Sequence, residues 1–298
     1  MSELTKRVLV AIVGIPLVIA AIWFGGWFFY TLLFLVNAFA IDEYFNMLRF
    51  KTETLFYRFL YIFSSQILFA TAYYLFNNQA LIYFLFVIPI LPIFYAFFDL
   101  KSNTNWGLTR ISGRLHGFLY ITFSLITFYF IREIDDLILY LNPSTTFSNI
   151  TNSENISELA ELKSFFGAKI LFCIFVSIWV CDSFAYFVGK AIGKNKLAEK
   201  ISPKKTIEGA AGGFIGAIIV GTIFYYADDF AANYIYLIIA FICGTIGQIG
   251  DLVESLLKRD VGVKDSSNLI PGHGGVLDRV DSLIAVSPFI LLILVIVL

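Results

Sequence analysis

Residues 234–298 read YIYLIIAFICGTIGQIGDLVESLLKRDVGVKDSSNLIPGHGGVLDRVDSLIAVSPFILLILVIVL, which is two apolar runs joined by one charged loop. The runs cover about 234–257 and 281–298, and each approaches the roughly 20 residues that a helix needs to cross a hydrocarbon core. Between them, Lys258–Ser282 holds two lysines, two arginines, four aspartates and a histidine. The segment therefore predicts two membrane-spanning helices and a loop whose charges need a chemical role.

The composition of the whole chain extends this prediction. Hydrophobic residues make up 59% of the 298 residues, charged residues only 14%, and the mean hydropathy is +0.82. These values exclude a soluble globular protein and predict an all-α, polytopic membrane protein with about nine spans. The predicted spans are 8–24, 27–45, 56–76, 80–99, 112–131, 169–190, 209–227, 234–257 and 281–298.

The basic residues predict the orientation of these spans. With the N-terminus in the cytoplasm, 18 of the 21 lysines and arginines fall on the cytoplasmic side. The other side holds Arg132, Lys163 and Lys169 and adds the acidic pair Asp228 and Asp229. Because lysine and arginine concentrate in the cytoplasmic loops of membrane proteins, we expect an N-in, C-out topology.

This topology divides the chain into three parts. Residues 1–131 would form about five N-terminal spans, and 132–168 a polar extracytoplasmic insertion with a short surface helix near its end. Residues 169–298 would form about four further spans, connected on the cytoplasmic side by the loops 190–208 and 258–281.

One helix face in the eighth predicted span is charged. Asp251, Glu254, Ser255 and Lys258 stand at i, i+3, i+4 and i+7, so they share one face. An ionisable group inside an apolar span is costly and normally faces a cavity or a partner. Asp251 therefore indicates a functional site, with an ion pair to Lys258 at the membrane boundary as the alternative.

The loop that follows returns to the membrane as PGHGGVLDRVDS, residues 271–282. Its glycines around His273 suit a backbone that turns sharply and approaches another group closely. Asp278 and Asp281 then open the last span, and paired carboxylates are the ligands that Mg²⁺ prefers. The nearby bases Lys258, Arg259, Lys264 and Arg279 suit phosphate groups. The two sets together predict a metal–polyphosphate site.

A second polar cluster is expected on the same side. Asp182 interrupts the apolar run WVCDSFAYFVGK, and the loop after it contains Ser202, Lys204, Lys205 and Thr206. Attraction of this basic loop to lipid headgroups alone is the other interpretation.

The stretch SLLKRDVGVKDSSNLIPGHGGVLDRVD, residues 255–281, resembles the signature of the phosphatidate cytidylyltransferases, also called CDP-diacylglycerol synthases. The upstream segments DSFAYFVGKAIGKNKL and ISPKKTIEG are also similar to that family, so the resemblance covers about 180–298. The matching elements are Ser255, Lys258, Arg259, Lys264, Asp265, Pro271, His273, Gly274, Gly275, Asp278, Arg279 and Asp281.

The resemblance implies a reaction in which CTP and phosphatidic acid give CDP-diacylglycerol and pyrophosphate, with Mg²⁺ and a second cation, K⁺. It also implies a nine-span fold, a homodimer and a funnel open to cytoplasm and membrane. We expect an inner-membrane enzyme in contact with membrane lipid, without a nucleic-acid partner. Asp251 and Asp278 would hold Mg²⁺, with Asp281 as a direct or indirect ligand and Asp182 as a weaker candidate.

The predicted site residues follow from this assignment. The catalytic set is Asp251, Asp278, Lys258, Arg259, Lys264 and Arg279. The substrate-binding set is Ser202, Lys204, Lys205, Thr206, Ser255, His273, Gly274 and Gly275. His116 has no evident partner in the sequence and is expected to be an interfacial residue.

Two other functions fit parts of the pattern. In a transporter, Asp182, Asp251 and Asp278 would line a path for a coupling ion. However, the acids gather with bases in cytoplasmic loops, and internal repeats are not evident. Another lipid-phosphate enzyme, such as a CDP-alcohol phosphatidyltransferase or a polyprenol kinase, is the second alternative, but the first of these needs a DGxxAR-type array that the chain lacks.

Overall fold

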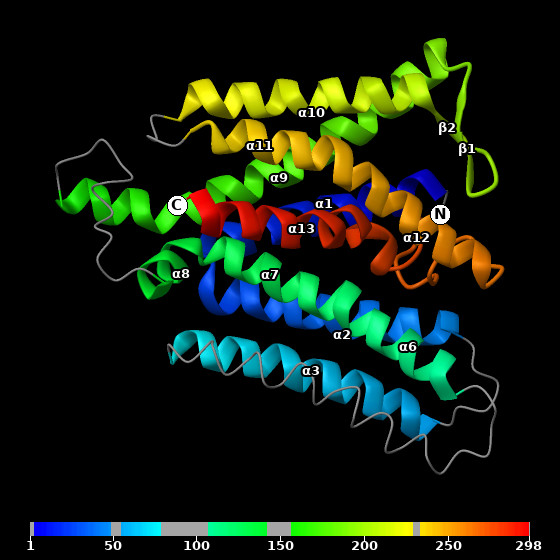
Figure 1. The fold of residues 1–298 in the computed structure, drawn as a ribbon, viewed down its shortest axis with the longest axis horizontal. Helices are drawn as coiled ribbons and strands as arrows, with labels where there is room; N and C mark the ends of the chain where they lie inside the picture. The colour runs from blue at the N-terminus through cyan, green and yellow to red at the C-terminus, as the bar shows by residue number, and fades with distance from the viewer. Residues whose placement is uncertain (1–2, 49–54, 79–106, 142–155, 229–232, 298) are drawn as a thin grey trace.

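The computed structural model describes residues 3–48, 55–78, 107–141, 156–228 and 233–297, which are almost entirely helical (Figure 1). The N-terminal helices are α1 Glu3–Phe24, α2 Gly26–Leu48, α3 Leu55–Asn77, α6 Gly107–Gly117, the π-helical turn η2 Phe118–Thr122, α7 Phe123–Arg132 and α8 Ile134–Leu141. The C-terminal elements are α9 Ile156–Ile192, β1 Lys196–Ala198, β2 Ser202–Thr206, α10 Ile207–Ala227, α11 Ile235–Ile242, the π-helical turn η4 Cys243–Gly247, α12 Gln248–Asp260 and α13 Leu277–Val297.

Long apolar helices confirm the prediction of a polytopic membrane protein. Seven segments of the described residues are long and apolar enough to span a bilayer, and a shorter apolar helix covers Val8–Phe24. The seven are Gly26–Leu48, Arg58–Asn77, Ser112–Arg132, Phe166–Ile192, Ile207–Ala227, Ile235–Asp260 and Leu277–Val297. The predicted span 80–99 lies outside the described residues, so the count of nine and the orientation stay predictions.

The first two helices meet at a glycine pair. Gly25 and Gly26 have φ values of +61° and +48°, which L side chains rarely adopt. Arg132 of α7 donates to the carbonyl oxygens of Ile22 and Trp23 at 2.6 and 3.1 Å, and Glu133 accepts from the amide of Gly26 at 2.9 Å. The end of α7 therefore caps the turn between α1 and α2.

Helix α10 packs closely against α9 along a stripe of small residues. A Cβ atom at Gly209, Gly212 or Gly213 would lie 2.7–2.8 Å from atoms of α9. Gly209 and Gly213 are four residues apart, which is the small-xxx-small spacing that lets two helices approach closely. Both face carbonyl oxygens of α9, so the two backbones are in contact.

Two segments differ from the sequence prediction. Residues 196–206 form an antiparallel hairpin, with Lys196 opposite Thr206 and Ala198 opposite Ser202, so the chain is not purely α. The predicted insertion 132–168 contains α8 and the start of α9. Helix α9 is 37 residues long and continues into the sixth predicted span. Its helical end is therefore the beginning of a long helix rather than a separate short one.

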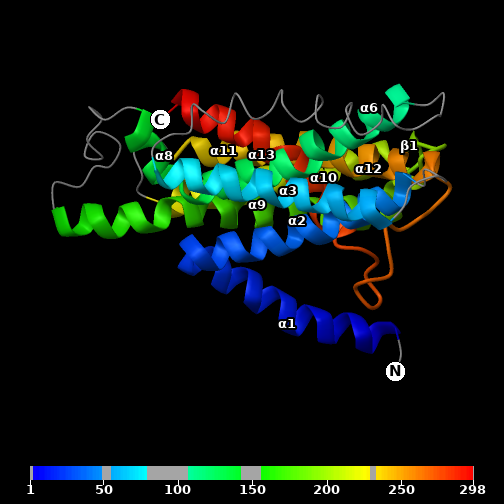
Figure 2. The ribbon, with the colours of Figure 1, turned by 90° about the horizontal axis from the view of Figure 1, so that it is seen from below.

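Polar connections gather at one end of the helix bundle. In Figure 1 the β1–β2 hairpin, the end of α12, the loop between α12 and α13, and the N-terminus lie together at the right. Figure 2 shows α1 at the edge of the bundle beside α2. This arrangement places the two predicted charged loops side by side.

Candidate active site

The contact between α12 and α13 builds the centre of the site. A Cβ atom at Gly250 would lie 2.3 Å from the Cβ of Ala285 and 3.2 Å from the carbonyl oxygen of Asp281. Only glycine permits this approach. It brings the acidic face of α12, with Asp251 and Glu254, against Asp281 on the second turn of α13.

Carboxyl groups cluster at this contact. Glu254 is fully buried, and its two oxygens accept no hydrogen bond from the described residues. Glu254 interacts electrostatically with Asp281, and Asp281 also interacts with Asp251 and with the exposed Asp182 of α9. We call Asp182, Asp251, Glu254 and Asp281 the acidic cluster. Only Glu254 of the four is fully buried, but neighbouring like charges repel, so a proton or a cation would stabilise the cluster.

Mg²⁺ fits the chemistry of this cluster. Carboxylate oxygens are its preferred protein ligands, and the two buried oxygens of Glu254 accept no hydrogen bond from the described residues, although Lys258 Nζ lies 3.4 Å from Oε1. In the described part of the chain, no three acidic, histidine or cysteine side chains converge on one point. Asp251 is paired with Lys205. Its carboxylate would therefore have to rotate to join Glu254 and Asp281 as a ligand of one metal ion.

Asp278 has a different environment from the acidic cluster. One of its oxygens accepts from Lys258 Nζ at 2.7 Å, and the other accepts from the amides of Ser266 and Gly275 at 3.0 and 2.8 Å. The hydroxyl oxygen of Ser266 lies 3.1 Å from the same oxygen. Asp278 therefore fastens the 261–276 loop to α13, and direct metal ligation by it stays a prediction.

Lys258 contacts both Asp278 and the acidic cluster. It is buried, and its Nζ lies 3.4 Å from Glu254 Oε1 as well as 2.7 Å from Asp278 Oδ1. The prediction that the charged face of α12 continues to Lys258 is confirmed, although the lysine pairs with Glu254 and Asp278 rather than with Asp251.

The β1–β2 hairpin contributes a second lysine to the site. Lys205 Nζ forms a hydrogen-bonded ion pair with Asp251, although the two residues are far apart in sequence. Successive strand residues point to opposite faces, so Lys204 is directed away and is exposed. The structure therefore brings Lys205, but not Lys204, to the acidic cluster.

The other predicted hairpin residues support the backbone. Thr206 is the N-cap of α10, and its hydroxyl accepts from the amide of Gly209 at 3.1 Å. Ser202 pairs with Ala198 at the start of β2. Glu208 accepts from the amides of Lys194 and Asn195 at 3.1–3.2 Å and so closes the base of the hairpin.

The remaining predicted bases lie at the rim. Arg259 donates to the carbonyl oxygens of Ile201 and Val263 at 3.3 and 2.8 Å, which ties the hairpin and the loop to α12. Lys264 and Arg279 are exposed. Ser255 lies 3.5 Å from Asp251, and the Nδ1 atom of the half-buried His273 accepts no hydrogen bond from the described residues.

The glycines of the 261–276 loop are explained by close contacts. Gly274 has φ +83°, and a Cβ there would lie 2.6 Å from Asp278 Oδ2. A Cβ at Gly275 would lie 1.9 Å from Ser266 Oγ and 2.4 Å from Glu43 Oε2. Both positions therefore have to lack a side chain for Asp278 to reach the loop.

Gly275→Ala is expected to displace the loop and to lower activity by about 10-fold or more, since a small misplacement of a reacting group costs up to about 100-fold. Thermal unfolding in detergent should show a loss of about 1–3 kcal/mol from overpacking. Gly14→Ala, where a Cβ meets nothing within 4 Å, is the matched control and should leave both quantities unchanged. Equal behaviour of the two variants would contradict the steric explanation.

Sequence reasoning missed several residues from the N-terminal half. His116, which was expected to be interfacial, is exposed; its Nδ1 lies 2.8 Å from the hydroxyl of Tyr44, and its ring stacks on Tyr120 at 5.4 Å. Tyr120 lies on η2, and its buried hydroxyl has no hydrogen-bond partner in the described residues and interacts electrostatically with Glu254. Glu43 of α2 contacts the 261–276 loop directly. An acidic residue within an apolar run was the signal available for Glu43 and Glu254.

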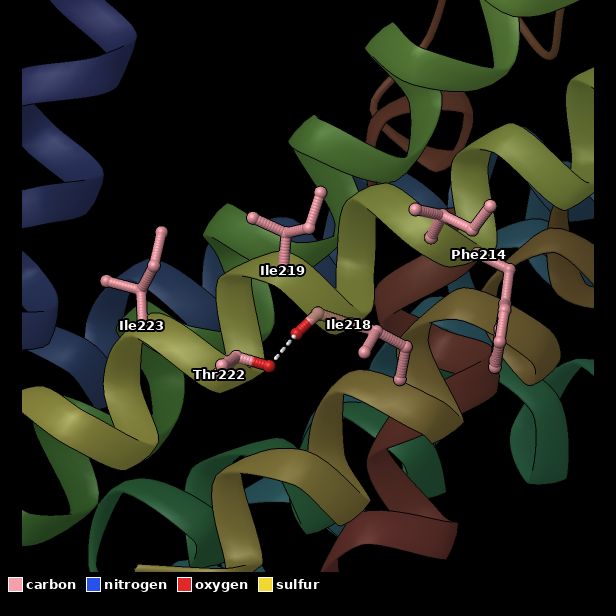
Figure 3. Close-up of a pocket in the computed structure, with 6 residues that line it drawn as sticks. Phe214, Ile218, Ile219, Thr222 and Ile223 are labelled. Atoms are coloured by element: carbon pink, nitrogen blue, oxygen red, sulfur yellow. Dashed lines mark hydrogen bonds between the residues drawn. The ribbon is translucent and has the colours of Figure 1, made fainter.

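An apolar hollow lies elsewhere, along α10 (Figure 3). Its lining residues are Phe214, Ile215, Ile218, Ile219, Thr222 and Ile223. The hydroxyl of Thr222 is bonded to the carbonyl oxygen of Ile218 at 2.8 Å, so no polar group is available there for a nucleotide.

Comparison with known proteins relates the chain to a family over almost its whole length. The model of the cytidylyltransferase family matches residues 5–297. The chain is 51% identical over 130 residues to the phosphatidate cytidylyltransferase of Bacillus subtilis, covering 43% of this chain and 48% of the relative. It is 48% identical over 130 residues to that of Haemophilus influenzae, covering 41% and 44%.

Both of these matches span about half the length of the relative. A third relative, the phosphatidate cytidylyltransferase of Synechocystis, is 31% identical over 303 residues, covering 99% of this chain and 97% of the relative. Since the family model and this relative both extend over nearly the whole chain, the chain belongs to the cytidylyltransferase family.

Proposed function

We propose that the protein transfers a cytidylyl group from CTP to phosphatidic acid, giving CDP-diacylglycerol and pyrophosphate for phospholipid synthesis. The observation that carries the proposal is the ion pair between Lys205 and Asp251, which joins a basic loop to the acidic cluster at one end of the bundle. A nucleotide from water and a phosphate attached to a membrane lipid can meet at such a membrane edge.

In the proposed reaction, an oxygen of the lipid phosphate attacks the α-phosphorus of CTP. The new P–O bond forms as the bond from the α-phosphorus to the oxygen bridging to the β-phosphorus breaks, and pyrophosphate leaves with that electron pair. The lipid phosphate is anionic at neutral pH, so the main barrier is repulsion between two polyanions rather than removal of a proton. Electrostatic stabilisation and positioning are therefore the main tasks of the site.

We propose that Asp251, Glu254 and Asp281 hold Mg²⁺, which supplies charge neutralisation to the triphosphate. Direct ligation by Asp278 and Asp182 and a second cation such as K⁺ remain predictions. Lys205 would exchange its contact with Asp251 for one with a substrate phosphate. Lys204, Lys264 and Arg279 are exposed around the same end and would attract the nucleotide, while Lys258 holds Asp278 and Glu254 in place.

Release of pyrophosphate by purified protein in detergent tests this function. Release is expected only when CTP, Mg²⁺ and phosphatidic acid are all present, with one CDP-diacylglycerol formed per pyrophosphate. CTP hydrolysis without lipid, or no turnover by folded protein across several lipids, would contradict the proposal. The second outcome would favour the transporter alternative.

We further propose a nine-span, N-in and C-out arrangement in the bacterial inner membrane, with the site facing the cytoplasm. The gathering of the N-terminus, the hairpin and the 261–276 loop at one end of the bundle supports this topology (Figure 1). The resemblance noted above implies a homodimer, which light scattering of the detergent complex would test.

In the variant Lys264→Cys, the introduced thiol is expected to react with a membrane-impermeant maleimide only from the cytoplasmic side of sealed vesicles. A cysteine at Asn233, beyond the other end of α10, should react only from the opposite side. The three native cysteines are buried, so the background should be small. Labelling of both positions from one side would overturn the topology.

A further inference from the structure

Glu43 connects helix α2 to the charged loop through four long-range hydrogen bonds. Its side chain is 3% exposed. Oε1 accepts from the hydroxyl of Ser267 at 2.6 Å and from the amide of Val276 at 2.9 Å. Oε2 accepts from the hydroxyl of Ser266 at 2.8 Å and from the amide of Leu277 at 2.9 Å. One carboxylate on α2 thus receives four hydrogen bonds from residues more than 220 positions away in the sequence.

Two of these bonds cap the N-terminus of α13. The first amides of a helix have no partner within the helix, and a negative charge beside them is favourable. Val276 and Leu277 lie at the start of α13, so Glu43 satisfies amides that the local sequence leaves open. Asp278 is the next residue, and Asp281 follows one turn later, so the position of this helix end sets the position of both carboxylates.

Of the other two bonds, the one from Ser266 leads from Glu43 toward the acidic cluster. Ser266 Oγ lies within hydrogen-bonding distance of both Glu43 and Asp278. Asp278 is bonded to Lys258, and Lys258 approaches Glu254. A continuous polar chain therefore connects α2 to the acidic cluster, and Glu43 acts on the cluster only through its neighbours.

The four donors to Glu43 are neutral hydroxyl and amide groups. The residue before it, Asp42, instead forms an ion pair with Arg58 at 2.5 Å and is partly exposed. Two adjacent acids on α2 thus have different roles, since Asp42 links α2 to α3 and Glu43 holds the charged loop. The pair provides a matched control within one helical turn.

We propose that Glu43 is a positioning residue for the reaction, which anchors the 261–276 loop and the first turn of α13 so that Asp281 meets Glu254. This inference rests on the function proposed above. It assigns the N-terminal half a direct part in the geometry of the site, although every predicted site residue lies at position 182 or later.

The test compares Glu43→Gln, Glu43→Asp and Glu43→Ala with Asp42→Asn. Glutamine has nearly the same shape, but its amide nitrogen is a donor and faces two donors of the loop. We expect kcat to fall about 10- to 100-fold in Glu43→Gln and at least as much in Glu43→Ala. KM for CTP should change less than about 3-fold, because Lys205 and the hairpin are untouched. Glu43→Asp, which retains the charge, should recover part of kcat.

A second measurement does not depend on activity. Hydrogen–deuterium exchange of peptides covering 264–277 should be faster by about 10-fold in Glu43→Gln and Glu43→Ala, and unchanged in Asp42→Asn. The proposal is overturned if kcat per folded molecule stays within 3-fold of the wild type in the Glu43 variants. It is also overturned if Asp42→Asn loses as much activity as Glu43→Gln. If the wild type itself lacks turnover, the proposed function fails, and unchanged exchange would additionally refute the anchoring.

Discussion

Asp281→Asn is expected to lower the rate of CDP-diacylglycerol formation by about 100-fold or more, because removal of one electrostatic stabiliser commonly costs that much. The variant should nevertheless be at least as stable as the wild type. Asp281 is half-buried and interacts electrostatically with the fully buried Glu254. Replacing one by a neutral amide removes this repulsion and adds a donor for an orphaned oxygen of Glu254.

Opposite changes in activity and stability identify a site selected for function rather than for folding. The rates are measured as label from CTP recovered in lipid extract, and stability as thermal unfolding in detergent. Asp228→Asn is the control, since Asp228 pairs with Lys169 at 2.6 Å at the opposite end of α10. Full activity in Asp281→Asn, or an equal loss in Asp228→Asn, would remove the acidic cluster from the mechanism.

Lys258→Met is expected to destabilise the protein by about 3–5 kcal/mol, which is the usual cost of removing one partner of a buried ion pair. Lys258 contributes the cation between Glu254 and Asp278, and its side chain is only 11% exposed. Without it, two buried carboxylates face each other without compensation, so activity should also be abolished.

Lys258→Arg is the matched comparison for this prediction. It keeps the charge but not the compact ammonium, so it should retain most of the stability and lose activity only partly. Thermal unfolding of the three proteins in the same detergent gives the comparison. A Lys258→Met variant as stable as the wild type would show that Glu254 and Asp278 are neutral or otherwise paired.

Helix periodicity predicted the charged face of α12 correctly, because Asp251, Glu254 and Lys258 are close neighbours along one helix. It could not predict which acid each base contacts. Asp251 pairs with Lys205 from another loop, and this choice depends on how the hairpin folds back over the helix end. The hairpin itself was missed because strands of three and five residues leave almost no pattern in a sequence.

The sequence also could not show that Asp278 and Asp281 have different surroundings. Asp278 and Asp281 stand three residues apart, and from the sequence Asp278 was expected to hold Mg²⁺ and Asp281 to be a direct or indirect ligand. In the structure the oxygens of Asp278 accept hydrogen bonds from Lys258, Ser266 and Gly275, whereas Asp281 interacts with Glu254. Only the path of the 261–276 loop separates the two roles.

Glu43 shows a further limit of local reasoning. An acid within the apolar run of α2 was visible, but its partners lie 223 to 234 residues away, so no spacing rule could assign it. Its four hydrogen bonds join the N-terminal helix α2 to the 261–276 loop and the start of α13.

Binding of Mn²⁺, followed by electron paramagnetic resonance on purified protein with CTP, tests most directly whether the acidic cluster holds the divalent cation of the reaction. The wild type and Asp228→Asn are expected to bind the ion with the same affinity. Asp281→Asn and Glu254→Gln should each weaken its binding by about 10-fold or more, as loss of a carboxylate ligand does. Unchanged Mn²⁺ affinity in both variants would contradict the account and move the metal site away from the contact between α12 and α13.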